Sequence, residues 1–292
     1  MPAIISSDTI YTNKVRKYYD QSQKWYNLFW SDKESLGMHF GFWEPGTDSH
    51  KEALINQYRS VQKYIHIQPG EKILDVGCGI GGASIWFART LPGEFIGITL
   101  SPVQLQQAIR NAQKAGVTDR VSFKLINYFK TGFPDCFFDK IFSIESACYS
   151  YPNPEVLYKE LFRILKPGGT LVISDGVMSR KPNNPYEQRL FREWFDSWAL
   201  PGGSTIKEVE QALTNSSFEN IQYINKTKEI KPHVIKLYRL CRIFYPLLWF
   251  LGKFSNFFRY GYNNTIGGIN QKLLYDTGAF AYGIFVATKP YY

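Results

Sequence analysis

The sequence predicts an α/β protein: a doubly wound, mostly parallel seven-stranded sheet with N-terminal helices and a helical cap inserted before the last strand. Short apolar runs alternate with longer amphipathic stretches, which is typical of a parallel sheet with helices on both faces. A glycine-dense turn at 77–82 follows the first of these runs. Hydrophobic residues make up 44% of the 292 residues, which excludes a disordered chain and allows one large domain with an inserted cap, or two small ones.

Two helices precede the sheet. Residues 13–29 are expected to form a helix rich in Tyr and Trp, and residues 50–65 a second helix between turns at 46–49 and 68–70. Strands and helices then alternate along the chain. The expected strands are Lys72–Val76, Glu94–Thr99, Val121–Ile126, Phe138–Ile144 and Thr170–Asp175, and the expected helices are Gly81–Arg89, Val103–Ala115 and Glu155–Leu165, with a turn at 166–169.

The pattern changes after Val177. Proline and glycine residues break the chain on both sides of a short amphipathic stretch at 186–198. The expected elements after it are a helix at 206–214, a sixth strand at 218–224 and a last strand at 278–288. The segment between these two strands, 227–275, is therefore an insertion, which we expect to cap the ligand cleft.

Aromatic residues are unusually frequent, because 20 Tyr, 22 Phe and 7 Trp make up 17% of the chain. A packed core accounts for part of these aromatic side chains. The remainder suit a pocket for a bulky apolar ligand or for one that carries positive charge. The net charge of +9 and the isoelectric point near 9.2 are compatible with nucleic acid, anionic lipid or an acidic substrate. Because no dense Lys/Arg block or nucleic-acid motif is present, nucleic acid is not expected as a partner.

The four cysteines have no C-x-x-C spacing and no His cluster beside them, so we expect reduced thiols, with neither a metal site nor a disulfide framework. They are Cys78, Cys136, Cys148 and Cys241. The first twelve residues lack the apolar stretch of a signal peptide. No apolar run reaches the about 20 residues that a membrane-spanning helix needs. The sequence thus predicts a cytoplasmic protein that is soluble or bound peripherally to a membrane.

The most informative motif is the turn after the first strand, which reads Asp75-Val76-Gly77-Cys78-Gly79-Ile80-Gly81-Gly82. Glycines let the backbone approach a ligand, and the start of the next helix offers unpaired N–H groups. The spacing differs from the G-x-G-x-x-G pattern of dinucleotide sites. It resembles instead the first motif of the class I S-adenosylmethionine (SAM) methyltransferases.

This resemblance implies that SAM is the cofactor and S-adenosylhomocysteine the product. The residues it assigns to the methionine half of SAM are Gly77, Cys78, Gly79 and Gly81. SAM carries an amino group and a sulfonium but no pyrophosphate, so the Asp75 carboxylate favours SAM and would repel a dinucleotide. The alternative is a non-catalytic α/β domain that has kept the turn.

Two further strand ends complete the expected cofactor site. The segment G-I-T-L-S-P-V-Q at 97–104 looks like the tocopherol and cyclopropane-lipid methyltransferases. Because no acid stands there for the ribose hydroxyls, we expect the cofactor to meet backbone and side-chain groups of Thr99, Leu100, Ser101 and Gln104, with Ser101 also suited to an N-cap. After the third strand, Asn127 stands where class I methyltransferases often place an Asp that accepts from the adenine amino group, and Tyr128 is placed to stack on the ring.

The fourth strand ends in Glu145-Ser146-Ala147-Cys148, which resembles the E-A-T-C segment of sterol methyltransferases. Glu145 is therefore a candidate both for the cofactor site and for catalysis, and Tyr149 is a candidate proton acceptor. Many O-methyltransferases of this superfamily carry a His a few positions later, and its absence argues against removal of a proton from a hydroxyl. The alternative for Glu145 is a purely structural carboxylate.

The N-terminal helix carries Tyr18-Tyr19-Asp20, and the next loop carries His39-Phe40-Gly41-Phe42-Trp43. Tocopherol, sterol and sugar-methylating relatives have a similar Y-D pair and H-x-G-x-W/Y loop, and in them the helix folds over SAM. The resemblance implies that Tyr18 touches the cofactor and that Tyr19 lies near the reacting centre, where a phenol suits positive charge. His39 is the best-placed imidazole, either as a catalytic base or as a structural residue.

The insertion contains a basic and aromatic segment at 231–258. Lys236, Arg239 and Arg242 recur at helical spacing beside apolar residues, and the run at 245–251 is almost wholly apolar. The pattern favours an interfacial helix on an anionic membrane, or equally a helix that packs on the sheet and walls the substrate pocket. Either alternative implies an apolar substrate.

Together, the segments from Tyr18 to Asp175 resemble class I methyltransferases of the sterol, tocopherol and cyclopropane-lipid group, which have a Rossmann-like core. The resemblance implies methyl transfer from SAM to a small hydrophobic acceptor (a lipid, isoprenoid or sterol-like molecule), most often at carbon. The alternatives are O- or N-methylation of a lipid or natural product with His39 as base, and a non-catalytic SAM- or lipid-binding protein.

The implied organisation has four parts: N-terminal helices that cover the cofactor at 1–60, the SAM-binding core at 61–226, the substrate cap at 227–275 and the closing strand at 276–292. The sequence leaves open the identity of the acceptor, the methylated atom and the oligomeric state.

Overall fold

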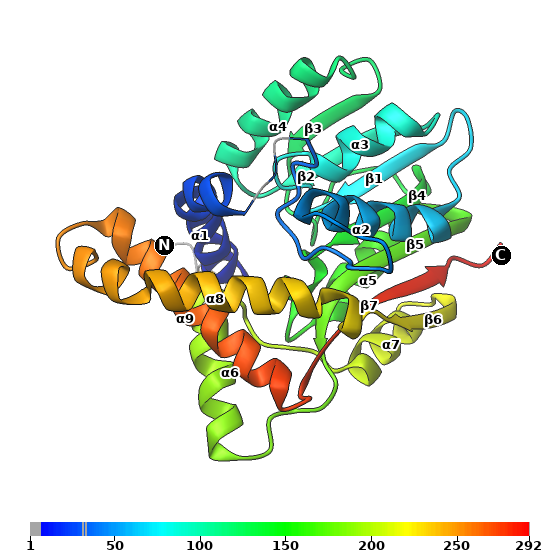
Figure 1. The fold of residues 1–292 in the computed structure, drawn as a ribbon. Helices are drawn as coiled ribbons and strands as arrows, with labels where there is room; N and C mark the ends of the chain where they lie inside the picture. Colours follow the sequence, from blue (N-terminus) through cyan, green and yellow to red (C-terminus); the bar gives the residue numbers. More distant parts are fainter. Residues whose placement is uncertain (1–6, 31, 33, 292) are drawn as a thin grey trace, which may run out of the picture.

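The computed structural model describes residues 7–30, 32 and 34–291. In this part of the chain, seven strands form one sheet in the order β3-β2-β1-β4-β5-β7-β6 (Figure 1). The strands are β1 (Lys72–Val76), β2 (Glu94–Thr99), β3 (Val121–Leu125), β4 (Phe138–Ile144), β5 (Leu165–Met178), β6 (Glu219–Asn225) and β7 (Phe280–Thr288). Strands β1 to β5 pair in parallel, and β7 pairs antiparallel with both β5 and β6. The predicted doubly wound, mostly parallel sheet is confirmed.

Helices cover both faces of the sheet. Alternate strand residues point into two separate hydrophobic clusters, as the neighbours Ile73 and Leu74 in β1 show. One cluster joins the sheet to α2 (His50–Ile65), α3 (Gly82–Thr90) and α4 (Pro102–Ala115). The other joins it to α5 (Pro154–Ile164) and α7 (Ile206–Asn215). Burial on both faces explains why the strands read as continuous apolar runs.

Local capping chemistry sets where the helices begin. Ser101 is the N-cap of α4, where its side chain accepts from the backbone N–H of Gln104, and Pro102 occupies the first turn. Thr205 and Glu208 form a reciprocal capping box at the start of α7. The expectation that Ser101 acts as an N-cap is confirmed.

The structure corrects three of the expected element bounds. Helix α1 (Ser7–Phe29) begins six residues before position 13, and the amphipathic stretch after Val177 is a full helix, α6 (Pro185–Ser197). The expected turn at 166–169 lies inside β5, where it bulges between the residue that pairs with Phe138 and the one that pairs with Lys140. A bulge accommodates the Pro-Gly-Gly sequence without ending the strand. The start predicted from the sequence pattern, Thr170, was therefore too late, because β5 begins at Leu165.

The insertion forms a helical cap, as predicted. Helices α8 (Thr227–Leu251) and α9 (Asn256–Asp276) lie between β6 and β7 in the chain, pack against each other, and meet α6 through α9. Figure 1 shows the α8–α9 turn projecting beyond the rest of the molecule, close to α1. Trp25 of α1 stacks on Phe257 of α9 with ring centroids 4.6 Å apart. No helix among the described residues has the length and apolarity needed to cross a bilayer.

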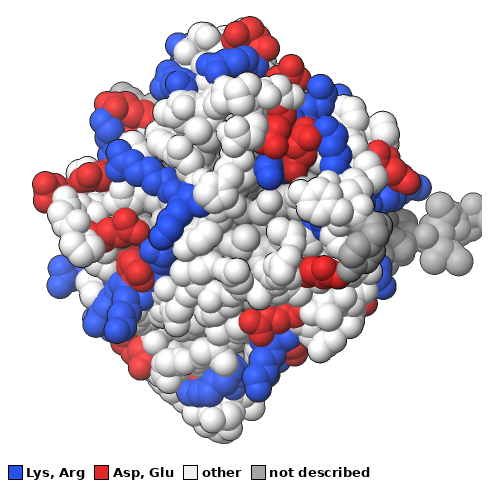
Figure 2. Space-filling view, turned by 90° about the vertical axis from the view of Figure 1, so that its right-hand side faces the viewer, with Lys and Arg blue, Asp and Glu red and all other residues white. Residues whose placement is uncertain are grey.

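Charged residues of both signs are dispersed over one face of the molecule. On the face shown in Figure 2, Lys and Arg alternate with Asp and Glu around a broad uncharged middle. This face has no continuous basic stretch of the kind that follows a nucleic-acid backbone.

Candidate active site

A first cavity lies at the carboxyl ends of β1, β2 and β4, where open α/β sheets bind their ligands. Ten of the residues predicted for the cofactor lie on its wall. They are Asp75, Gly77, Cys78, Gly79, Thr99, Leu100, Ser101, Gln104, Tyr128 and Glu145. We refer to it as the sheet-end cavity.

The backbone of the glycine-dense turn closely approaches this cavity. Gly77 and Gly79 both adopt left-handed φ angles, +79° and +53°. A Cβ at Gly77 would also clash with the Ser146 side chain. Glycine is therefore required at position 77 on two independent grounds, one conformational and one steric.

Asp75 is a buried carboxyl on the wall of the sheet-end cavity. It is 2% exposed and accepts a hydrogen bond from Ser84 Oγ at 2.6 Å. Burial raises the pKa of this carboxyl to about 7. A cationic amino group brought beside Asp75 would compensate the cost of its buried charge, so the residues present fit the amino-acid end of SAM.

The start of α4 is fastened to α1. Ser101 Oγ donates to Asp20 Oδ1 at 2.5 Å, and Gln104 Nε2 donates to Gln23 Oε1 at 3.1 Å. Gln104 Oε1 also accepts from Thr99 Oγ1 at 3.0 Å. The side chains of Ser101 and Gln104, expected to bind ribose, thus hold the covering helix in place while they line the cavity.

Three predicted cofactor residues lie elsewhere. Gly81 is the N-cap of α3, with φ +86°, and a Cβ there would meet the Phe123 ring. Asn127 Oδ1 accepts from the backbone N–H of Phe129 at 3.0 Å and does not line the cavity. Tyr18 lines a second, larger cavity, where its hydroxyl contacts Tyr26 and Asn264.

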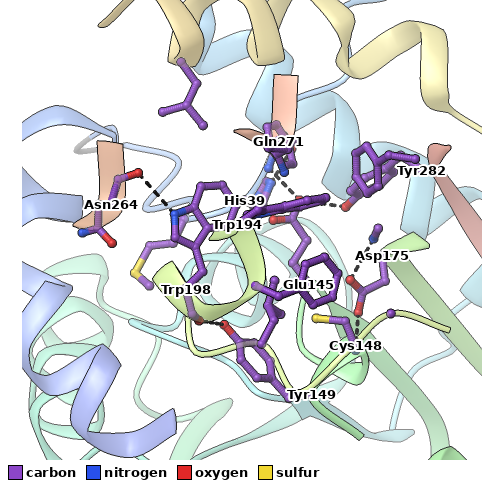
Figure 3. A pocket seen from close by; sticks show the side chains of 18 of the residues that line it. His39, Glu145, Cys148, Tyr149, Asp175, Trp194, Trp198, Asn264, Gln271 and Tyr282 are labelled. Atoms are coloured by element: carbon purple, nitrogen blue, oxygen red, sulfur yellow. Dashed lines mark hydrogen bonds between the residues drawn. The ribbon is translucent and has the colours of Figure 1, made fainter. Parts of the chain in front are cut away.

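The larger cavity, which we call the cap cavity, lies beneath the inserted helices (Figure 3). Its wall combines residues of α1, α6, α8 and α9 with the ends of β4 and β5. Aromatic side chains dominate it, among them Tyr18, Tyr26, Trp25, Phe29, Trp30, Trp194, Phe195, Trp198, Phe244 and Phe280. Such a wall accommodates a bulky apolar molecule.

The two cavities meet at five residues. These five, Tyr19, Met38, His39, Glu145 and Tyr149, line both cavities. Four of them are the residues that the sequence nominates for catalysis. The structure therefore brings together side chains from α1, the loop after it and the segment after β4.

Glu145 is the central acid of this junction. Its Oε1 accepts from the Phe40 backbone N–H at 2.7 Å and from the Tyr282 hydroxyl at 2.8 Å. Burial raises the pKa of Glu145 to about 8, and the nearby Asp175 carboxylate adds to this shift. The backbone at Glu145, directly after β4, has φ +50°, an unfavourable conformation for a non-glycine residue.

The other junction groups are neutral and ordered. His39 Nδ1 lies 2.7 Å from the Phe40 carbonyl, and burial lowers the pKa of this imidazole to about 4. His39 Nε2 is buried, and the Gln57 side chain of α2 interacts with this imidazole. Tyr19 donates to the Tyr149 hydroxyl at 3.1 Å, which in turn donates to the Trp198 carbonyl at 3.2 Å.

Comparisons with known proteins agree with this geometry. The family model described as mycolic acid cyclopropane synthetase matches residues 6–240. The chain is 30% identical over 213 residues to a sterol 24-C-methyltransferase of Pneumocystis carinii (strain B80), an alignment that covers 72% of this chain and 55% of that protein. It is 26% identical over 296 residues to the chloroplastic tocopherol O-methyltransferase of Arabidopsis thaliana, covering 94% and 82% of the two chains.

This chain belongs to the mycolic acid cyclopropane synthetase family. The membership and these relatives confirm the prediction of a class I SAM-dependent methyltransferase. The chain spans about half the length of the sterol methyltransferase that it matches.

Solved structures confirm the fold. A geranyl diphosphate C-methyltransferase of Streptomyces coelicolor A3(2), in a complex with Mg²⁺, geranyl diphosphate and S-adenosylhomocysteine, superposes with a TM-score of 0.72 at 18% identity, covering 99% of this chain and 100% of that one. The [4+2]-cyclase SpnF superposes with a TM-score of 0.74 at 21% identity, over 94% and 95%. Among the described residues of the present chain, no group of three or more His, Cys, Asp or Glu side chains could hold a metal ion.

Four residues of the site were not predicted from the sequence of this protein. Asp175, at the carboxyl side of β5, accepts from the Cys148 N–H at 2.9 Å and the Gly176 N–H at 2.8 Å, and burial raises its pKa to about 6. Its position at a strand end, like that of Glu145, was the available signal. Tyr282, Trp194 and Gln271 reach the site from β7, α6 and α9, and no local motif marks them.

Proposed function

We propose that this protein transfers the methyl group of SAM to a carbon atom of a small hydrophobic acceptor held in the cap cavity. The meeting of the two cavities at Tyr19, His39, Glu145 and Tyr149 carries this proposal. A donor in the sheet-end cavity and an apolar acceptor in the cap cavity would meet at these side chains. Positioning of this kind accounts for much of the rate of a group transfer.

The chain's own residues have distinct parts in binding the donor. When bound, SAM supplies an electrophilic methyl group. We propose that Asp75 holds the cationic amino group, that the backbone at Gly77 and Gly79 contacts the same end, and that Tyr128 lies against the adenine ring. The aromatic wall and α1 exclude water from the junction.

Carbon methylation is supported by the chemistry of the junction. Addition of a methyl group to an alkene leaves positive charge on the acceptor, which the faces of Tyr19 and Tyr149 and the Glu145 carboxylate stabilise. Loss of a C–H proton then restores a double bond, with the electron pair of that bond forming the new π bond. Glu145 takes the proton in this scheme, and the pKa of about 8 of this buried carboxyl makes it a competent acceptor.

O- or N-methylation is a second candidate, because the His39 imidazole lines both cavities. Its Nδ1 is held by the Phe40 carbonyl, so we infer that Nε2 carries the lone pair. A hydroxyl or amine of the acceptor at that point would lose its proton to His39.

Transfer of label from methyl-labelled SAM tests the proposal directly. The purified protein is incubated with a lipid extract of the source cells and, separately, with their water-soluble extract. We expect a labelled lipid, and NMR of that product distinguishes a new C–CH₃ from an O- or N-methyl group. Label confined to the aqueous extract would contradict the hydrophobic acceptor and leave the methyltransferase class intact.

We further propose that the α8–α9 turn contacts an anionic membrane, from which an apolar acceptor would be drawn. Large apolar side chains are exposed there, including Trp249 (49%), Phe250 (52%) and Phe254 (75%). Five basic residues and no acidic residue lie in segment 231–258, so its charge complements anionic headgroups. Dispersed basic residues around exposed rings are typical of an interfacial helix.

Co-sedimentation with vesicles tests this contact. We expect binding to vesicles of phosphatidylcholine with 30% phosphatidylserine in 50 mM salt, weaker binding in 500 mM salt, and little binding to phosphatidylcholine alone. The double variant Phe250→Ser/Phe254→Ser should lose most of this binding. Equal binding by the variant would contradict the assignment of this turn.

The four-part organisation stays a proposal: covering helices at 1–60, the core at 61–226, the cap at 227–275 and the closing strand at 276–292. Residues 1–6, 31, 33 and 292 of these parts lie outside the described residues. The α1 and α8–α9 contributions to the cavity walls support a covering function for the first and third parts.

A further inference from the structure

The cap cavity contains two polar side chains that its apolar wall does not explain. Trp194 of α6 and Gln271 of α9 are 3% and 1% exposed, and both line the cavity (Figure 3). Trp194 Nε1 and Gln271 Oε1 find no hydrogen-bond partner among the described residues. Buried donors and acceptors without partners are rare because each costs free energy of desolvation, so these two atoms are candidates to bind a polar group of a ligand.

The other indoles of the same wall make the contrast clear. Trp25 Nε1 donates to the Phe257 carbonyl at 3.1 Å, Trp30 Nε1 to the His39 carbonyl at 3.1 Å, and Trp198 Nε1 to the Asn264 carbonyl at 3.3 Å. Each of these N–H groups is satisfied within the protein. Trp194 is the exception among the four indoles that line the cavity in the described part of the chain.

The charges around the cavity restrict what this atom can be. Two carboxyls, Glu145 and Asp175, lie on the wall, whereas no Lys or Arg occurs among the described residues that line it. A diphosphate, phosphate or carboxylate would be buried without a countercharge and close to two acids, which is strongly unfavourable. An oxygen group that meets Trp194 and Gln271 would therefore be uncharged.

We propose that Trp194 and Gln271 bind a hydroxyl group of the methyl acceptor and thereby select uncharged apolar alcohols. A hydroxyl oxygen accepts from the indole N–H, and its own proton is donated to Gln271 Oε1, so one group satisfies both side chains. This assignment rests on the proposed function. It narrows the acceptor from any hydrophobic molecule to one with an apolar body and a neutral oxygen group.

Isothermal titration with matched isoprenoids tests the assignment. The protein is loaded with S-adenosylhomocysteine and titrated with primary C10, C15 and C20 isoprenoid alcohols, with the hydrocarbons of the same skeletons, and with the corresponding diphosphates. At the chain length that binds best, we expect the alcohol to bind about tenfold more tightly than the hydrocarbon. The diphosphate should bind more weakly than the alcohol.

Two variants and a matched control assign the effect to residues. Trp194→Phe and Gln271→Leu should each reduce the preference for the alcohol to less than about threefold. Trp198→Phe removes an indole whose N–H is already bonded to backbone, so it should retain the tenfold preference. Thermal unfolding monitored by circular dichroism establishes that each variant is folded.

The outcomes separate this inference from the proposed function. Wild-type protein that binds alcohol and hydrocarbon equally, prefers the diphosphate, or binds no alcohol of the series would overturn the inference, whatever the variants do. None of these results affects the label-transfer assay, which tests methylation independently. Loss of label transfer with an intact alcohol preference would instead overturn the proposed function alone.

Discussion

Three buried carboxyls set the electrostatic character of the site at the scale of single residues. Burial raises the pKa of Asp75 to about 7, that of Glu145 to about 8 and that of Asp175 to about 6. Each carboxyl would ionise more readily beside a positive charge. The site is therefore suited to a cationic ligand such as SAM and unsuited to a dinucleotide.

Replacement of Asp75 tests the cofactor site. We expect Asp75→Ala to weaken SAM binding by about 100-fold or more, because a cationic amino group loses its buried countercharge. Isothermal titration with SAM measures this change. Asp48→Ala, which removes an exposed carboxylate, serves as the control. Affinity within threefold of wild type for Asp75→Ala would contradict the assignment.

Replacement of Glu145 tests its catalytic assignment. We expect Glu145→Gln to lower kcat by about 10²- to 10⁴-fold while SAM affinity stays within threefold, because the amide cannot accept the proton. Single-turnover rates with labelled SAM and direct titration separate these two effects. Near-normal turnover would remove Glu145 from catalysis.

The pH profile provides a second signature of Glu145. Because the carboxylate is the active form and the pKa of Glu145 is about 8, kcat/KM should rise between pH 6 and 9, and this limb should disappear in Glu145→Gln. The Tyr282 hydroxyl lowers the pKa of Glu145, so Tyr282→Phe should move the limb to higher pH. An unchanged limb in both variants would show that another group titrates.

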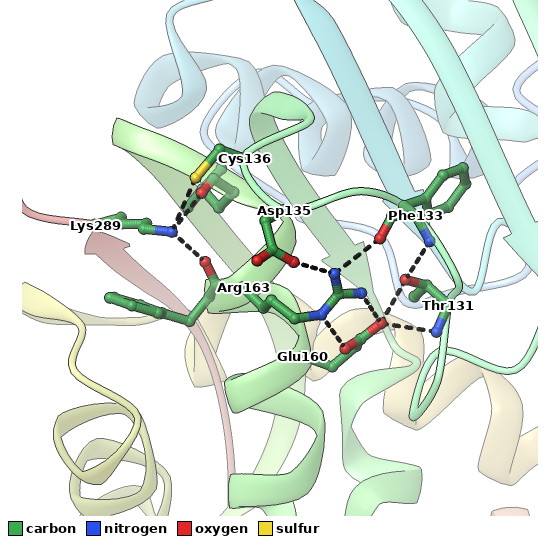
Figure 4. A network of polar contacts seen from close by, with 9 residues as sticks. Thr131, Phe133, Asp135, Cys136, Glu160, Arg163 and Lys289 are labelled. Atoms are coloured by element: carbon green, nitrogen blue, oxygen red, sulfur yellow. Dashed lines mark hydrogen bonds and ion pairs between the residues drawn. The ribbon is translucent and has the colours of Figure 1, made fainter.

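At the scale of elements, one polar network is built on the last turn of α5 (Figure 4). Glu160 accepts from the Thr131 backbone N–H at 2.8 Å and from Arg163 Nε at 2.9 Å, and Arg163 Nη1 donates to the Phe133 carbonyl at 2.8 Å. The network therefore connects α5 to the loop between β3 and β4. Although burial opposes ionisation, these donors hold the pKa of Glu160 below its usual range.

Glu160→Gln should lower the free energy of unfolding by about 1–2 kcal/mol at pH 7. A carboxyl whose pKa is depressed in the folded state stabilises above its unfolded pKa of about 4.3 and loses this contribution as pH falls. The difference from wild type should therefore shrink below pH 4. Urea unfolding at pH 7 and pH 3.5 measures it, with Glu94→Gln, which breaks an exposed ion pair with Lys72, as the control. A constant difference across pH would contradict this account.

A chain of two imidazoles holds α8 against α2. The Gly41 N–H donates to His233 Nδ1, His233 Nε2 lies 2.6 Å from His50 Nδ1, and His50 Nε2 lies 2.9 Å from the Trp30 carbonyl. With both rings neutral, every bond in this chain has one donor and one acceptor. Burial lowers the pKa of both His233 and His50.

The contribution of these two imidazoles to stability should consequently fall on mild acidification. A histidine with a depressed folded pKa stabilises above its unfolded pKa of about 6.5, and this contribution is lost as pH decreases below that value. We expect the free energy of unfolding of the wild type, measured relative to that of His233→Gln, to decrease between pH 7 and 5. His66→Gln, which changes an exposed imidazole, should retain the full decrease. Parallel pH curves for all three proteins would contradict a contribution from His233.

At the scale of the whole molecule, the sequence predicted what local patterns specify. The turn from Asp75 to Gly82, the Ser101 N-cap and the strand end at Glu145 are each encoded within about ten residues. Tyr282 reaches Glu145 across 137 positions only because β7 inserts antiparallel between β5 and β6. Trp194 and Gln271 join the cap cavity through packing of α6 on α9, which no short-range periodicity reveals.

Two residues predicted to contact the cofactor lie away from the sheet-end cavity for a related reason. Tyr18 and Tyr19 are adjacent on α1, so the helix directs them differently, and it is Tyr19 that lines both cavities while Tyr18 lines the cap cavity. Asn127 caps its own turn instead of lining the sheet-end cavity, because a short side chain bonds readily to backbone two residues on. Side-chain direction depends on geometry that alignment of motifs does not supply.

Helix α1 also has a consequence for the order of events during turnover. Tyr19 belongs to the walls of both cavities, and the bonds of Asp20 and Gln23 to Ser101 and Gln104 close the helix over the sheet-end cavity. An acceptor in the cap cavity would block the return of SAM or the exit of its product. Steady-state kinetics should therefore follow a compulsory order, with SAM bound first and S-adenosylhomocysteine released last, so that this product competes with SAM but not with the acceptor.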